Sequence, residues 1–323
     1  MASRNSKGEN GNGAKAGEAY AKAVAEVAKL VVGKKDVVED LLIAVFSEGH
    51  VLLEGVPGIA KTRMANAIAL TLDCGFKRIQ FTPDMLPSDI IGTMVFDSNK
   101  NDFIFKKGPI FTNIILADEI NRAPPKTQSA LLEAMQEHQV TVEGVTHQLP
   151  YPFIVLATQN PIEMEGTYPL PEAQVDRFIF KLLLGYPSKE EEKEIVQMKM
   201  KDDVEIEKVL APEGIKAIGA QIQEVEMDSS ILDYIVEIVS ATRTRSDVQL
   251  GASPRASISL MKGAKAKALL EGRDYVIPDD VKAVVFPVLR HRITLNPESE
   301  LAGVGVDDVI NDVLSGVKVP KQK

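Results

Sequence analysis

A loop that ends in a lysine and a threonine is the first place in this sequence where the residue types indicate chemistry. Residues 55–62 read Gly-Val-Pro-Gly-Ile-Ala-Lys-Thr, after the apolar run 51–53 and before a helical segment that starts at Arg63. A strand, a glycine loop and a helix in this order form a phosphate-binding loop, because N–H groups at the helix N-terminus point towards phosphate oxygens. The residues expected to bind a nucleotide here are Gly55, Pro57, Gly58, Ile59, Ala60, Lys61, Thr62 and Arg63.

One residue of this loop departs from the strict pattern, since Ala60 stands where a glycine normally precedes the lysine. An alanine costs little in the right-handed helical conformation, and only a positive φ would demand glycine. We therefore expect Ala60 to be right-handed, as the start of a helix allows. The alternative interpretation of the stretch is an ordinary strand-to-helix turn. The choice between this turn and a phosphate-binding loop depends on whether the other parts of a nucleotide site are present.

Two acids follow a second buried strand. The run Ile114-Ile115-Leu116-Ala117 leads directly into Asp118 and Glu119, and open α/β sheets bind ligands at the carboxyl ends of their strands. Asp118 is expected to hold Mg²⁺ together with the Thr62 hydroxyl. Glu119 is expected to orient and deprotonate the attacking water. Taken alone, the pair could also be two solvated acids after a strand.

Three further polar residues lie next to predicted elements. Asn160 follows a fourth strand, so its amide could reach the same water or the γ-phosphate, although Asn before Pro is also a turn signal. Arg177 precedes a fifth strand and alone would be a surface arginine. Arg255 follows Ser253 and Pro254, which can cap and open a helix. A positive charge at a helix N-terminus is unfavourable, so we expect an anion to compensate Arg255.

The chain divides into an α/β part and a helical part. Short apolar strands alternate with helices as far as about residue 185, which predicts a parallel sheet covered on both faces. Hairpin signals at 93–105 and 140–149 interrupt this alternation. From there on the pattern is helical and holds no convincing strand. The expected divisions are a disordered tail at 1–13, an α/β core at 14–185 and a helical domain at 186–323.

Composition narrows the classes of partner. The formal net charge of -9 argues against a general nucleic-acid coat and against anionic membrane surfaces. Cys74 is alone, and the four histidines have no metal-site spacing, so we expect structural roles for them. No apolar run approaches the roughly 20 residues that span a bilayer, and the first residues lack a signal peptide's apolar core. A cytoplasmic protein is expected.

The motifs together resemble those of AAA+ ATPases, and within that superfamily the MoxR family, relatives of the magnesium chelatase ATPase subunit. The resemblance extends from Val31 to about Arg290, and its Walker A, Walker B and sensor motifs follow one another in the family's order. An alanine is tolerated in that family at the position of Ala60. The supporting segments are Val32-Gly33, 55–62, 81–89, 117–125, 157–161, 176–178 and 253–255.

This resemblance implies a role for each candidate residue. Lys61 and Thr62 would be the Walker A ligands, and Asp118 and Glu119 the Walker B pair. Asn160 would be sensor 1, Arg255 sensor 2 and Arg177 an arginine finger, with Val32 and Gly33 near adenine. The implied fold is a five-stranded parallel sheet of order 5-1-4-3-2, in which the two hairpins are the helix-2 insert and the pre-sensor-1 insert, with a C-terminal all-α lid.

The resemblance also implies an activity. ATP with Mg²⁺ would lie between the subunits of a ring, expected to be a hexamer, and an arginine finger would serve the neighbouring subunit. The output would be remodelling or maturation of client proteins, typically with a partner that carries a von Willebrand A domain. One alternative is a nucleic-acid motor with Lys100, Lys106 and Lys107 lining a pore, against which the acidity counts. A nucleotide-switched adaptor is the other alternative.

Overall fold

A parallel sheet forms the centre of the molecule. The computed structural model describes residues 10–56, 58–160, 166–199 and 205–320, so Pro57 and Pro161 lie outside the described residues. The sheet has five strands in the order β2-β5-β8-β1-β9, which is the expected order 5-1-4-3-2 when only these strands are numbered. They are β1 (Val51–Gly55), β2 (Phe76–Gln80), β5 (Ile114–Asp118), β8 (Ile154–Gln159) and β9 (Phe180–Leu184).

Both faces of the sheet are buried, because successive side chains of each strand enter different apolar clusters. Leu53 and Leu116 belong to a cluster with the first helices and the C-terminal helices, whereas Leu52 and Ile115 face the other cluster. This double coverage explains why the inner strands β1, β5 and β8 begin with apolar runs, whereas the edge strand β2 is mostly polar.

Helices and a 3₁₀ turn connect the strands. Helix α1 begins at Asn10, so the expected tail through Gly13 is too long, and its remainder at 1–9 lies outside the described residues. Packing of α1 against α2, α3 and α10 overrides the low helix propensity of its glycines. The elements are α1 (Asn10–Ala28), α2 (Lys35–Phe46), α3 (Lys61–Thr71), α4 (Pro87–Ile91), η1 (Ile120–Arg122), α5 (Pro125–Glu137) and α6 (Glu172–Val175).

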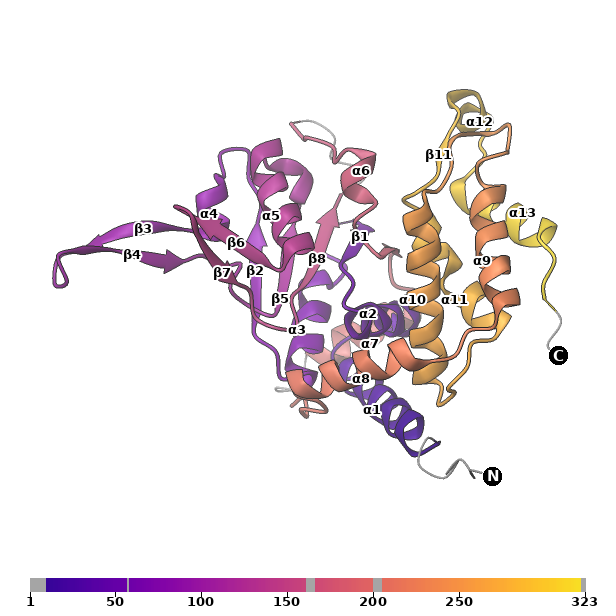
Figure 1. The fold of residues 1–323 in the computed structure, drawn as a ribbon, viewed down its shortest axis with the longest axis horizontal. Helices are drawn as coiled ribbons and strands as arrows, with labels where there is room; N and C mark the ends of the chain where they lie inside the picture. The colour runs from indigo at the N-terminus through magenta and orange to yellow at the C-terminus, as the bar shows by residue number, and fades with distance from the viewer. Residues whose placement is uncertain (1–9, 57, 161–165, 200–204, 321–323) are drawn as a thin grey trace, which may run out of the picture.

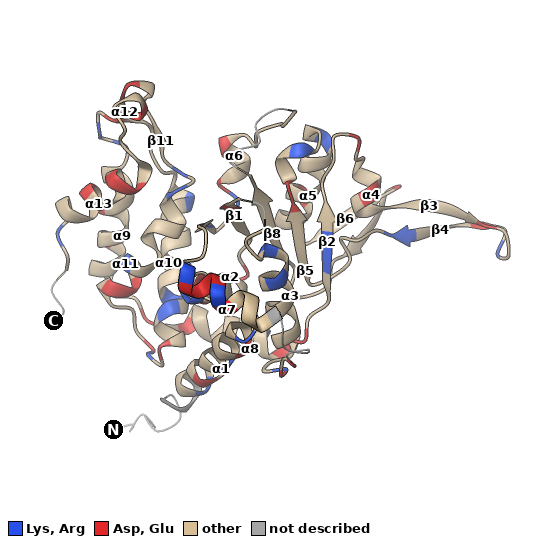
Figure 2. Ribbon diagram, turned by 180° about the vertical axis from the view of Figure 1, so that it is seen from behind, with Lys and Arg blue, Asp and Glu red and all other residues tan. Residues whose placement is uncertain are grey.

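Both expected hairpins are present. One is β3 (Gly92–Asp97) with β4 (Asp102–Lys107), and the other is β6 (Gln139–Val142) with β7 (Val145–Gln148). The β3–β4 hairpin projects far from the body, on the side opposite to the C-terminal helices (Figure 1). Basic positions lie along β4 and in its turn (Figure 2).

The C-terminal part is a helical lid with one small sheet. The expectation that it holds no strand is wrong, because β10 (Val248–Leu250) pairs with β11 (Thr294–Leu295). Strands of two or three residues are too short to produce a period-two pattern in the sequence. The helices are α7 (Lys189–Lys199), α8 (Pro212–Glu224), α9 (Ser229–Ala241), α10 (Pro254–Leu270), α11 (Pro278–Leu289), α12 (Pro297–Leu301) and α13 (Val306–Gly316).

The lid and the sheet share one apolar core. Phe180 of β9 packs against the lid, and a methyl group built on Gly263 of α10 would lie 3.2 Å from its ring. β9 ends at Leu184 and α7 starts at Lys189, and we propose the domain boundary between them, at 185–186. None of the helices in the described residues is long and apolar enough to cross a membrane.

Candidate active site

The loop between β1 and α3 has the backbone geometry of a phosphate cradle. A Cβ atom on Gly55 would lie 2.5 Å from the Leu184 carbonyl oxygen, so only glycine fits there. Gly58 has a φ of +83°, and nothing lies within 4 Å of the position of its absent Cβ, so its outer side is open. Lys61 and Thr62 then form the first turn of α3, where free N–H groups favour an anion.

The conformation of Ala60 differs from the expectation. Its φ is +67° and its ψ is 21°, so the residue before α3 is left-handed rather than right-handed. This left-handed residue is the N-cap of α3. A side chain at positive φ is strained by about 1 kcal/mol or more relative to glycine, so the glycine of the strict pattern would be the unstrained residue here.

The variant Ala60→Gly is therefore expected to be more stable than the wild-type protein. Relief of about 1 kcal/mol should raise the midpoint of thermal unfolding by about 2 °C in a chain of this size. Differential scanning fluorimetry without nucleotide measures this shift. The control is Ala65→Gly in the interior of α3, which should lower the midpoint. A lower midpoint for Ala60→Gly would contradict the strain.

Lys61 connects the loop to the acids of the neighbouring strands. Its Nζ donates a hydrogen bond to the Gly55 carbonyl oxygen. Burial lowers the pKa of Lys61, while the negative charges of Asp118, Glu119 and Glu54 oppose that shift. The structure thus brings the loop and the two acids to the same carboxyl edge of the sheet, as the sequence predicts.

Asp118 is held by two side chains. The Thr158 hydroxyl donates to Oδ1 over 2.6 Å, and Arg78 donates to Oδ2 from Nη2 over 2.6 Å and from Nε over 2.9 Å. Carboxylate and hydroxyl oxygens suit Mg²⁺, so Asp118 and Thr62 are chemically fit to hold it. The Arg78 side chain is 48% exposed and can turn away at little cost.

Glu119 is also held by neighbours. Its φ is +57°, and its backbone N–H donates to the Thr158 hydroxyl over 2.8 Å. Its carboxylate accepts a hydrogen bond of 2.8 Å from Gln80 and forms an ion pair of 3.1 Å with Arg122. Both contacts are to Oε2, so they engage one oxygen of the carboxylate.

The sequence interpretation missed the four partners of these acids, Arg78, Gln80, Arg122 and Thr158. A signal was present for two of them, because Arg78 and Gln80 are two residues apart on β2 and so share one face. The parallel register then places Gln80 beside Asp118.

Asn160 follows β8 directly and is 7% exposed. Since β8 lies between β5 and β1, the end of this strand lies between the acids and the loop. The structure thus places Asn160 at the same carboxyl edge of the sheet as the loop and the acids.

Helix α7 lies beside both Gly33 and the start of α3. Gly33 has a φ of +70°, and a Cβ atom there would overlap the Glu191 side chain of α7 in its present position. Arg63 Nη2 lies 3.6 Å from the Met198 sulfur at the other end of α7. These two contacts are seven residues apart, about 10 Å along the helix axis. Val32 and Gly33 also line a largely apolar cavity of about 490 Å³.

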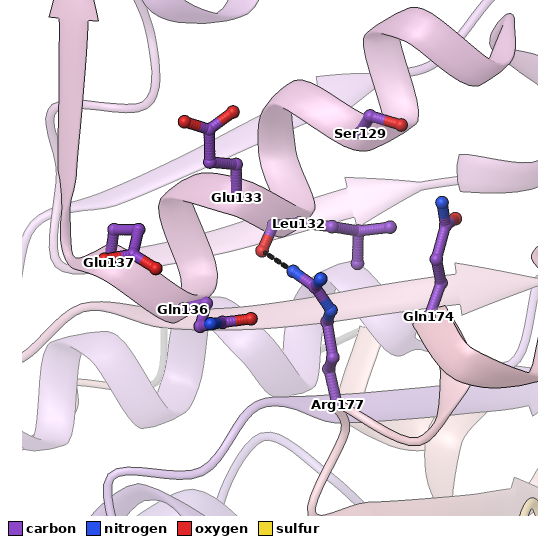
Figure 3. A pocket seen from close by; sticks show the side chains of 7 residues that line it. All are labelled: Ser129, Leu132, Glu133, Gln136, Glu137, Gln174 and Arg177. Carbon is purple, nitrogen blue, oxygen red and sulfur yellow. Dashed lines mark hydrogen bonds between the residues drawn. The ribbon is translucent and has the colours of Figure 1, made fainter.

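Arg177 lies at the edge of the sheet formed by the amino ends of the strands, opposite to the carboxyl edge that carries the loop. Its Nη1 donates to the Leu132 carbonyl oxygen of α5 over 2.9 Å (Figure 3). Among the described residues its Nε is buried without a hydrogen-bond partner. The surrounding pocket has a volume of about 290 Å³ and is lined by Ser129, Leu132, Glu133, Gln136, Glu137, Gln174 and Arg177.

Arg255 lies near Arg177. Both line a small cavity of about 170 Å³ together with His50, the residue before β1. The loop begins at the other end of β1, and five strand residues span about 16 Å. The candidate residues therefore form two groups, one at each edge of the sheet.

His50 itself has a structural role. Its Nδ1 accepts a hydrogen bond of 3.1 Å from the Val155 N–H, and Nε2 lies 2.9 Å from the Met135 carbonyl oxygen. Burial lowers the pKa of His50 to about 4, so the ring is neutral at pH 7. It links the start of β1 to β8 and α5, next to the cavity that it lines with the two arginines.

The local prediction for Arg255 is confirmed. Ser253 caps α10 by accepting the Arg255 N–H over 3.1 Å, and Pro254 is the first residue of the helix. An anion does face the arginine, but it belongs to the chain: Asp176 Oδ2 lies 3.7 Å from Arg255 Nη1. The sequence interpretation did not assign a role to Asp176 or to its second partner, Arg292.

Comparisons with known proteins agree with this geometry. Residues 50–180 match the family model described as "ATPase family associated with various cellular activities (AAA)", and residues 240–313 match that of the AAA lid domain. The chain is 52% identical to "Uncharacterized protein YeaC" of Bacillus subtilis (strain 168), over 94% of this chain and 95% of that protein.

Two further matches cover almost the whole chain. "Chaperone MoxR1" of Mycobacterium tuberculosis is 45% identical, over 93% of this chain and 82% of that protein. The crystal structure of a candidate ATPase from Cytophaga hutchinsonii superposes with a TM-score of 0.90 at 46% identity, over 96% of this chain and 98% of that one. Fold, motifs and relatives therefore agree that the chain belongs to the MoxR family of AAA ATPases.

Proposed function

We propose that this ATPase binds ATP with Mg²⁺ at the carboxyl edge of its sheet and hydrolyses it in a ring whose subunits complete one another's sites. The observation that carries this proposal is the separation of the two groups of candidate residues. Arg177 and Arg255 lie beside His50, at one end of β1, whereas Lys61 follows the other end. At about 16 Å or more, neither arginine reaches a phosphate held by its own loop.

The carboxyl edge supplies the residues for binding and for water activation. Backbone N–H groups at the start of α3 and the Lys61 ammonium hold the phosphates. Thr62 and Asp118 hold the cation, which neutralises phosphate charge when it is bound. Glu119 accepts the proton of the attacking water, and Asn160 orients that water. Val32 and Gly33 lie beside the adenine, at the end of α7 that is remote from Arg63.

The amino edge supplies positive charge to a neighbouring subunit. Arg177 has a buried Nε without a partner among the described residues, a donor that an anion from outside the chain would satisfy. Arg255 is 47% exposed and is held by one ion pair of 3.7 Å, so it is free to move to a phosphate. In a ring, each subunit presents its two arginines to the phosphate-binding loop of the next subunit.

We further propose a hexameric ring in the cytoplasm that remodels or matures client proteins together with a von Willebrand A domain protein. The name of the 45% identical relative, "Chaperone MoxR1", supports an output of this kind.

The test of this proposal measures assembly and nucleotide binding together. Mass photometry of the wild type with ATP and Mg²⁺ is expected to show one closed oligomer, and a fluorescent ATP analogue should bind to it. Lys61→Ala should lower the affinity for the analogue at least tenfold. The matched control is Lys77→Ala on the exposed side of β2, which should change neither result. A chain that stays monomeric at saturating ATP contradicts the ring.

A variant that holds ATP without hydrolysing it tests whether client proteins bind in a nucleotide-dependent way. Glu119→Gln carrying an affinity tag is expected to retain the same proteins in ATP and to release them in ADP, as mass spectrometry of the eluates would show. Identical eluates in ATP and ADP would contradict a nucleotide-driven remodelling function.

A further inference from the structure

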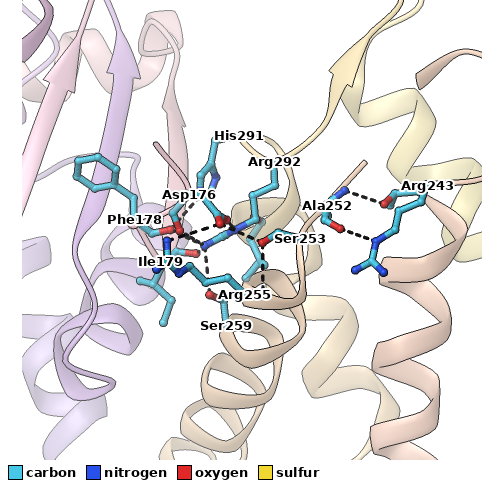
Figure 4. A network of polar contacts seen from close by, with 12 residues as sticks. Asp176, Phe178, Ile179, Arg243, Ala252, Ser253, Arg255, Ser259, His291 and Arg292 are labelled. Atoms are coloured by element: carbon cyan, nitrogen blue, oxygen red, sulfur yellow. Dashed lines mark hydrogen bonds and ion pairs between the residues drawn. The ribbon is translucent and has the colours of Figure 1, made fainter. Parts of the chain in front are cut away.

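The buried arginine of the lid, Arg292, binds the segment that carries Arg177. Its side chain is 1% exposed. Nε donates to Asp176 Oδ1 over 2.7 Å (Figure 4). Nη2 donates to the carbonyl oxygens of Asp176 over 3.1 Å and Phe178 over 2.7 Å, and Nη1 donates to that of Ile179 over 3.2 Å. The backbone on both sides of Arg177 is thus bonded to one guanidinium.

The same guanidinium is fixed to the lid. Nη2 also donates to the Ser259 hydroxyl of α10 over 3.2 Å, and Nη1 donates to the Val288 carbonyl oxygen of α11. Burial lowers the pKa of Arg292 to about 10, with Asp176 opposing the shift, so it remains charged at pH 7. A buried arginine needs all its donors satisfied, and here the partners lie in the Arg177 segment and in the lid.

Asp176 connects this arrangement to Arg255. Its Oδ1 accepts from Arg292, while Oδ2 accepts from the Ser253 hydroxyl over 3.0 Å and pairs with Arg255 over 3.7 Å. The Arg292 pair is short and buried, whereas the Arg255 pair is long and half-exposed. If Arg255 turns to another anion, the Arg292 pair still holds the segment.

We propose that Arg292 is a positioning residue that makes Arg177 move with the lid of its own subunit. The lid of one subunit thereby positions the arginine that completes the ATP site of the next subunit. The proposal rests on the proposed function. It assigns no contact with the substrate to Arg292, which acts through the backbone of 176–179.

The variant that tests it is Arg292→Lys, which keeps the charge but cannot bond several carbonyl oxygens at once. We expect kcat to fall at least tenfold, while the affinity for a fluorescent ATP analogue changes less than twofold. Without nucleotide, hydrogen–deuterium exchange should accelerate at least tenfold in peptides that cover 176–180. The control is Arg273→Lys, a lid arginine bonded to Asp280 and Glu271 that should leave all three measurements unchanged.

Mixed rings show through which residue Arg292 acts. Arg292→Lys subunits have an intact loop, so mixing with Lys61→Ala subunits, which have an intact Arg177, should restore hydrolysis. Mixing with Arg177→Ala subunits should restore none. Equal results in the two mixtures, or unchanged exchange at 176–180, would overturn the proposal.

A milder variant covers the case in which Arg292→Lys does not fold. Ser259→Ala removes one lid bond without leaving a charge unpaired, and it should lower kcat two- to fivefold with the same pattern in mixed rings. A wild-type kcat for Ser259→Ala, with Arg292→Lys unfolded, would also overturn the proposal. If Arg177→Ala and Lys61→Ala do not complement each other either, the proposed function itself has failed.

Discussion

Arg177→Ala is expected to lower kcat about 10³- to 10⁵-fold, the range that an arginine supplied by a neighbouring subunit contributes in phosphoryl transfer. The loss should fall on kcat, because Arg177 lies at the edge of the sheet remote from the loop that binds nucleotide. The affinity for a fluorescent ATP analogue should therefore stay within about twofold of the wild type. Phosphate release at saturating ATP measures the effect.

A matched control separates this role from a general loss of an arginine. Arg243 also donates a hydrogen bond to a backbone carbonyl, that of Ala252 over 2.8 Å, but it lies in the lid away from the cavity shared by Arg177 and Arg255. Arg243→Ala should keep kcat within about twofold. A tenfold weaker binding of ATP to Arg177→Ala would show that Arg177 serves its own site instead.

Glu119→Gln is expected to bind ATP with unchanged or higher affinity and to hydrolyse it about 10²- to 10⁴-fold more slowly, because an amide cannot accept the proton of the attacking water. The amide can still bond to the partners that hold this side chain, Gln80 and Arg122, so the local structure should persist. Single-turnover hydrolysis with radiolabelled ATP separates the chemical step from binding.

The control for this variant is Glu143→Gln. Glu143 is also an acid at positive φ, in the turn between β6 and β7, and lies far from the loop in sequence. It should hydrolyse ATP at the wild-type rate. Turnover of Glu119→Gln near that of the wild type would remove Glu119 as the general base.

The central strands and the residues at the carboxyl edge of the sheet could be predicted because they depend on local patterns. The strands β1, β5 and β8 begin with short apolar runs. Asp118 ends its strand, Asn160 follows its strand directly, and Lys61 follows its strand after the loop. The resemblance to a family then supplied the order of the strands, which composition and periodicity do not determine.

What could not be predicted depends on distant contacts or on backbone detail. Arg292 and Asp176 are separated by 116 positions, and neither belongs to a local pattern that indicates a partner. The left-handed Ala60 results from how the loop enters α3, which residue types at these positions do not reveal. The strands β10 and β11 are too short to have a period.

The proposed function depends on the separation of Lys61 from Arg177, and mixed rings test this separation most directly. Arg177→Ala subunits keep an intact loop, and Lys61→Ala subunits keep an intact Arg177. In a ring of random order, about a quarter of the interfaces join these two intact halves.

The measurement is the rate of phosphate release from an equimolar mixture, with energy transfer between labelled subunits to show that mixed rings form. We expect hydrolysis to recover to about a quarter of the wild-type rate, although each variant alone is inactive. Mixed rings that form and remain as inactive as the separate variants would contradict it.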